Sequence, residues 1–190
     1  MVSYIWAVPF DRAFGKLPKR LTQGWALNGV TRYSGGLPVG LSQGGDYSLV
    51  GGGNTDVPNL VGNVVTLNPR NPNPNCHAGD PTSDHTGCFF LSDAFASGPN
   101  GGFGNANRQF FHGPGINVTD FGISKRTRIR ETVGFEIRAE FFNVFNHANF
   151  NNPHGNFNNL DTFGTVTSTR SFGDTGSGSR EGQISAKFTW

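Results

Sequence analysis

The sequence predicts an all-β protein, an antiparallel meander of about six strands interrupted by one long loop. The first observation is composition, because 28 Gly and 11 Pro among 190 residues disfavour long helices and favour strands joined by turns. The second is a side-chain period of two in several segments, which is typical of strands. We therefore expect residues 1–190 to form a single β-rich domain.

The clearest alternation lies in residues 133–145, where one face is apolar and the other is charged. The apolar face carries Val133, Phe135, Ile137, Ala139 and Phe141. Such a strand fits a soluble sheet or a membrane barrel wall, which differ in whether a core or lipid covers the apolar face. Glu136 and Glu140 on the charged face resemble a glycosidase pair, but four residues along a strand separate them by roughly 13 Å, too far for that chemistry.

The same period predicts the other strands in order along the chain. The expected strands span residues 2–10, 24–42, 117–130, 133–145, 163–170 and 180–190, with a short basic connection at 11–23. If a tight turn at 130–132 joins the third and fourth strands, Ile129 faces Val133 and Arg126 faces Glu136. That register pairs apolar with apolar side chains and opposite charges with each other.

The long loop spans residues 43–116 and is rich in Gly, Asn, Pro, Asp and Ser without a period. Loops of this length are uncommon in compact soluble domains and are usually functional or disordered, whereas barrels carry long outer loops. Phe89 and Phe90 could anchor a folded loop, and together with Tyr47 they are candidate substrate-binding aromatics.

Net charge and hydropathy exclude some classes of protein. A formal charge of +2 with scattered basic residues does not predict nucleic-acid binding. No apolar run approaches the roughly 20 residues of a membrane-spanning helix, and the sequence opens on a strand-like segment rather than a secretory signal. We expect no cofactor.

The two cysteines, Cys76 and Cys88, lie close together in the long loop. A disulfide between them would contribute roughly 3 kcal/mol and indicate an oxidising compartment. Two alternatives remain open, a pair of free thiols or a zinc site with His77 and His85, although the latter spacing is unusual for zinc.

One segment matches a catalytic pattern, because residues 40–44 read G-x-S-x-G around Ser42. The alternative function is therefore a small serine esterase that uses Ser42 with Asp84 or Asp93 and with His85 or His112. In α/β-hydrolases this serine lies between a strand and a helix, and here a glycine-broken segment follows it. We therefore favour no catalytic residue and no metal site.

Six segments carry a family resemblance. They are GWALNGVTRYSGGLPV (24–39), VPNLVG (57–62), FGNANRQFFHGPGINVTDFGISK (103–125), AEFFNVFNHANFNNP (139–153), FGTVTSTR (163–170) and the closing REGQISAKFTW. They resemble the C-terminal end of TonB-dependent outer-membrane receptors, in particular the Oar-like branch with a carboxypeptidase-regulatory-like domain. The resemblance covers most of the chain.

The resemblance implies a bacterial outer-membrane protein with a plugged barrel of about 22 strands. It also implies a last strand whose aromatics, here Phe188 and Trp190, are read by the barrel-assembly machinery. The expected partners are outer-membrane lipid, that machinery, and the remaining strands and plug of a longer parent or an oligomer. Because about six strands are fewer than the roughly eight of the smallest barrels, we expect a receptor segment that is inactive alone.

Overall fold

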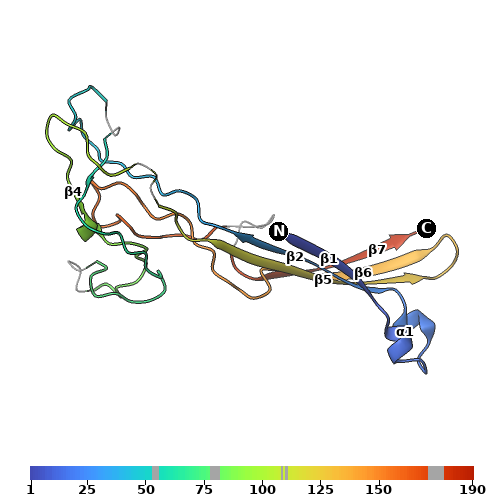
Figure 1. Cartoon of the computed structure of the whole chain (residues 1–190). Coiled ribbons are helices and arrows are strands. Elements are labelled where there is room, and N and C mark those ends of the chain that lie inside the picture. Colours follow the sequence, from blue (N-terminus) through green and yellow to red (C-terminus); the bar gives the residue numbers. More distant parts are fainter. Residues whose placement is uncertain (53–55, 78–81, 108, 110, 171–177) are drawn as a thin grey trace. The chain divides into compact units, whose positions relative to one another are not determined.

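The computed structural model describes residues 1–52, 56–77, 82–107, 109, 111–170 and 178–190. The chain divides into two compact units (Figure 1). The sheet unit comprises Met1–Ser34, Ile116–Asn149 and Arg170–Trp190, and the loop unit comprises Gly35–Gly115 and Phe150–Thr169. No helix among the described residues is long and apolar enough to cross a bilayer.

The sheet unit is an open antiparallel sheet of five strands in the order β1-β2-β5-β6-β7. The strands are β1 (Val2–Val8), β2 (Trp25–Ser34), β5 (Ile116–Arg128), β6 (Gly134–Phe142) and β7 (Glu181–Thr189). Two short helices, α1 (Phe10–Ala13) and α2 (Lys19–Thr22), connect β1 to β2. The all-β prediction is confirmed, and β1 and β7 are the two edges of the sheet.

The predicted register of the β5–β6 hairpin is also confirmed. Arg126 lies opposite Glu136, and the backbone N–H of Ile129 donates to the carbonyl oxygen of Val133 at 2.9 Å. Because a strand alternates its faces, this register carries most of the large apolar side chains of the five strands to one side of the sheet, although Ile5, Val30 and Val118 lie on the other.

Two predicted strand boundaries are wrong. The strand expected at 24–42 ends at Ser34, before Gly35 and Gly36. The strand expected at 163–170 forms only isolated bridges at Phe163, Thr165 and Thr169. Gly164 explains this second failure, because its φ of +79° is not a strand conformation and a Cβ there would lie 2.2 Å from the carbonyl oxygen of Phe90.

The ends of the other strands are set by turn residues. The first strand stops at Val8, and Phe10 begins the helical connection that follows Pro9. Strand β6 stops at Phe142 because Asn143 adopts a φ of 47°, a left-handed conformation that asparagine tolerates better than most residues.

The loop unit is not structureless, because it contains its own hydrophobic core. Its regular elements are the short strands β3 (Asn59–Leu60) and β4 (Phe95–Ala96), which pair with each other, and the 3-10 helix η1 (Ser92–Ala94). The core consists of Val39, Leu41, Phe89, Phe90, Ala94, Phe95, Ala106 and Phe163. Phe90 meets both Phe111 and Phe163 edge to face with ring centroids 5.1 Å apart, so aromatic contacts hold the irregular backbone together.

Candidate functional site

The apolar face of the sheet unit is continuous across all five strands. The pairings place Trp6 beside Leu27, Leu27 beside Ile123, Ile123 beside Ala139, and Ala139 beside Ile184. Along the strands this face also carries Tyr4, Val8, Trp25, Phe121, Phe135, Ile137, Phe141, Ala186 and Phe188.

Among the described residues, no second layer covers this face beyond its end at Trp25 and Lys125. Phe135, Ile137, Phe141, Phe188 and Trp190 all remain exposed, over a range from 37% for Phe135 to 87% for Trp190. Soluble proteins rarely leave a contiguous apolar surface of this extent open to water. The face therefore requires an apolar environment outside the chain.

The opposite face carries a ladder of ion pairs. Glu136 accepts hydrogen bonds from Arg126 at 2.7 Å and from Arg138 at 3.0 Å, and Arg138 also pairs with Glu140 at 3.5 Å. Gln183 on β7 donates to Glu140 at 2.7 Å. Both carboxylates are thus held by neighbouring strands, which suits a polar wall better than paired catalytic acids.

One cation interrupts the apolar face. Lys125 lies two residues after Ile123 and therefore on the same face of β5, yet it is buried. Its ammonium donates to the carbonyl oxygens of Arg20, at 2.9 Å, and of Gln23. The same ammonium lies 5.6 Å from the ring centroid of Trp25, within cation-π range. The strand alternation in the sequence places Lys125 on the apolar face. Its carbonyl partners at the end of α2 are seen only in the structure.

Buried asparagines close the end of the sheet at which β6 stops. The Asn143 side chain donates to the carbonyl oxygens of His147 and Gly178, each at 2.9 Å, and accepts from the His147 N–H at 3.0 Å. Asn149 accepts from the Asn117 N–H at 2.7 Å and donates to His147 O at 3.0 Å. The sequence predicted only a turn here, but these contacts give the NVFNHAN segment a defined structural role.

In the loop unit, Cys76 and Cys88 form the predicted disulfide, with Cα atoms 5.8 Å apart. The two sulfurs and His77 lie close enough for a metal, yet the sulfurs are bonded to each other and cannot act as thiolate ligands. His85 contacts the carbonyl oxygen of Cys76 through Nδ1 at 2.7 Å, so it supports the bridged loop.

Ser42 lies in extended backbone rather than at a strand-to-helix turn. Its N–H donates to the Gly155 carbonyl and its own carbonyl accepts from the Phe157 N–H, each at 2.9 Å. Described residues 44–52 form turns and bends without a helix. The G-x-S-x-G pattern therefore lacks the context that a nucleophile elbow has.

The proposed partners of Ser42 have other contacts. Asp84 accepts from the N–H and the hydroxyl of Thr86, which lower the pKa of its carboxyl. Asp93 lies in η1, and His112 forms a bridge with Pro38. Within the described residues, no hydrogen bond joins the Ser42 hydroxyl to His85 or His112.

The three candidate binding aromatics of the loop unit differ in accessibility. Phe89 and Phe90 are buried members of the core, which fits the expectation that they anchor a folded loop but not an exposed binding platform. Tyr47 remains partly accessible. The aromatics at the end of the chain differ from these, because Phe188 and Trp190 are exposed and their ring centroids lie 6.3 Å apart.

An open antiparallel sheet with one continuous lipid-compatible face and one charged face defines a wall segment of a membrane β-barrel. In agreement, residues 1–183 match the family model described as outer membrane beta barrel domain, and the chain belongs to that family. It is a protein of the bacterial outer membrane. No curated protein and no solved structure matches it.

Proposed function

We propose that the chain is the C-terminal wall of a TonB-dependent receptor-like transporter for an unidentified substrate, and that it is inactive without the rest of that barrel. The observation that carries the proposal is the largely uncovered apolar face, which spans all five strands from β1 to β7. The charged ladder of the opposite face would then line the lumen.

The strand count supports a segment of a larger wall. Five strands are too few to close, since single-chain outer-membrane barrels begin at about eight strands. Strands β1 and β7 form the edges of the sheet, and open edges pair readily with other strands. In a receptor of about 22 strands, the remaining strands would cover both edges and enclose the plug.

The loop unit supports a receptor. It is a folded body with a disulfide and a core of its own, built from the long connection between β2 and β5 together with Phe150–Thr169 between β6 and β7. In barrels the long connections lie on the outer side of the membrane, which is where an incoming substrate is first met. We assign substrate capture to this unit and recognition by the barrel-assembly machinery to Phe188 and Trp190.

A chimera tests the proposal. Placed after the plug and early strands of a receptor-like barrel that lacks its own last five strands, the chain should restore a protease-resistant barrel in the outer membrane. Uptake of the donor receptor's substrate should also return, and it should depend on the energy-coupling protein. A chimera that enters the membrane without coupled uptake would reject the transport role and leave the barrel wall intact. A chain that is soluble and monodisperse in buffer would reject both.

A further inference from the structure

The connection between β1 and β2 lies at one end of the sheet unit, next to the short turn that joins β5 to β6. Trp25 at the start of β2 pairs with Lys125 near the end of β5, and the chain turns back between Ile129 and Val133. Short turns of outer-membrane barrels lie on the periplasmic side. This connection, residues 9–24, therefore lies where the strands leave the bilayer on that side.

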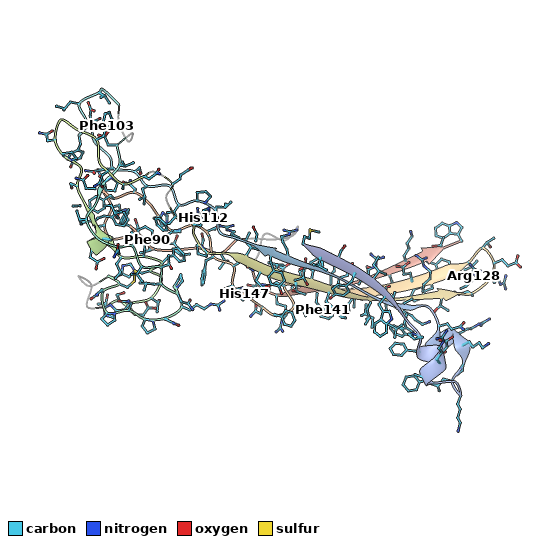
Figure 2. The ribbon with its side chains drawn as sticks, in the orientation of Figure 1. Phe90, Phe103, His112, Arg128, Phe141 and His147 are labelled. Carbon is cyan, nitrogen blue, oxygen red and sulfur yellow. A yellow bond between two sulfur atoms is a disulfide. The ribbon has the colours of Figure 1, made fainter. Side chains whose placement is uncertain are left out.

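Contacts fix the connection against the apolar face rather than the charged one. Phe10 packs against Phe14 and meets Trp25 edge to face, with centroid distances of 6.2 and 6.0 Å. The Trp25 indole N–H donates to the Leu21 carbonyl at 2.8 Å. The Lys125 ammonium donates to two carbonyl oxygens at the end of α2. Trp25 and Lys125 both belong to the apolar face, so this segment lies over the lipid-facing side (Figure 2).

The surface of the connection combines two properties. Phe14, Leu17 and Leu21 are more than half exposed, although each is a large apolar side chain. Among them lie four exposed cations, Arg12, Lys16, Lys19 and Arg20, against one acidic residue, Asp11. Apolar side chains surrounded by an excess of cations are typical of segments that lie in the headgroup region of a membrane.

We propose that residues 9–24 form an interfacial anchor that binds the anionic phospholipid headgroups of the bilayer leaflet at the periplasmic end of the strands. The apolar side chains enter the acyl boundary, while the cations reach the lipid phosphates. Lys125 donates to the carbonyl oxygens of Arg20 in α2 and of Gln23 just after it, which ties the anchor to β5. The inference applies to any outer-membrane wall and does not rest on the proposed transport function.

Vesicle binding of the full chain tests the anchor. Binding is measured to vesicles that contain one-third phosphatidylglycerol and to vesicles of pure phosphatidylcholine, and the quantity compared is the ratio of the two affinities. The apolar contribution of the sheet is common to both vesicle types and cancels in this ratio. The K16Q/K19Q variant should lower this ratio by about tenfold or more, since each cation near an anionic surface strengthens binding about fivefold. At about 1 M salt, where the Debye length is about 3 Å, the wild-type ratio should approach one.

The matched control removes the same charge from exposed residues of the opposite face. R128Q/K187Q should leave the ratio within about twofold of wild type, because these cations point away from the lipid-facing side. Leu21→Gln should weaken binding to both vesicle types and leave the ratio unchanged. A K16Q/K19Q ratio equal to wild type, or a control ratio that falls as far, would overturn the proposal.

Discussion

The sheet unit and the loop unit bury their apolar side chains in opposite ways. The sheet unit has regular hydrogen-bonded strands, yet it exposes residues such as Ile184 and Phe188 and buries the polar Lys125 and Asn143. The loop unit has almost no regular structure, yet it buries Phe90 completely. A regular hydrogen-bonded backbone and a hydrophobic core therefore need not occur in the same unit.

The two units are also stabilised by different interactions. A bilayer leaves no backbone polar group free, so the sheet satisfies its backbone through strand pairing and leaves its apolar face to lipid. The loop unit buries its apolar side chains within itself and obtains its stability from aromatic packing and a covalent bridge. Mutations should consequently act on one unit at a time.

The largest effect is expected for Phe90→Ala in the loop unit. Removing a fully buried phenylalanine from the aromatic core should destabilise this unit by about 3–5 kcal/mol. Limited proteolysis should show rapid cleavage within the loop unit while the sheet stays in the membrane fraction. Phe103→Ala is the matched control, because Phe103 is 71% exposed and its loss should change cleavage little (Figure 2). Equal cleavage of both variants would contradict a core centred on Phe90.

Loss of the disulfide should have the next largest effect. C76S/C88S removes a bridge that spans a sequence separation of 12 residues, which corresponds to roughly 3 kcal/mol of chain entropy. Denaturant unfolding of the loop unit, followed by proteolysis, should shift to lower denaturant concentration. Reduction of the wild type should produce the same shift, whereas reduction should not affect the double variant. If the bridge were dispensable, the untreated wild type, the reduced wild type and the double variant would unfold at the same denaturant concentration.

A charge on the apolar face should have a smaller but distinct effect. Ile184→Arg places a cation in the middle of β7 on the lipid-facing side, at a penalty of about 2 kcal/mol or more. Gln183→Arg places the same cation one residue earlier, on the charged face and opposite Glu140, and should be tolerated. The two variants are compared by the stability of the chimeric barrel in lipid, measured by thermal or denaturant unfolding. Equal loss in both variants would mean that the two faces do not meet different environments.

Sequence alone predicted the sheet unit well because its information is local and periodic. The alternation of Phe135, Ile137 and Phe141 assigned the faces, and a tight turn at 130–132 gave the register in which Arg126 faces Glu136. The burial of Lys125 was not predictable, since its carbonyl partners belong to a helical connection distant in sequence. Parity places it on the apolar face but does not supply partners.

The loop unit was predictable only in part, for a physical reason. Its core joins Val39, Phe90 and Phe163, which are far apart in sequence and follow no period. The disulfide could be inferred from two nearby cysteines, whereas the packing of Phe90 on Gly164 depends on a backbone conformation that only the fold defines. Ser42 differs, because the glycine-broken segment after it already argued against a nucleophile elbow, and the structure adds the backbone hydrogen bonds that hold it.

The smallest expected effect is a pH dependence of the stability of the loop unit that arises from Asp56. Asp56 is buried in the loop unit, where its carboxylate accepts from the Ser48 N–H at 2.9 Å and its backbone carbonyl accepts from Gln43. The hydroxyl of Ser48, and then its N–H, hold the pKa of Asp56 below the ordinary value of 3.8. A carboxyl whose pKa is lower in the folded state stabilises that state above its unfolded pKa, and the contribution is lost as pH falls through the folded pKa.

Stability of the loop unit should therefore decline below about pH 4, the usual pKa of an unfolded aspartate. Asp56→Asn should be less stable at neutral pH and should show a shallower decline on acidification, with the remaining slope including the contribution of Asp84, whose pKa Thr86 lowers in the same direction. Ser48→Ala should reduce the slope only in part, because the Ser48 N–H still donates to the carboxylate. Denaturant midpoints measured between about pH 2 and pH 6 test this order. A slope that is identical in wild type and Asp56→Asn would show that the carboxylate is equally solvated in the folded and unfolded chain.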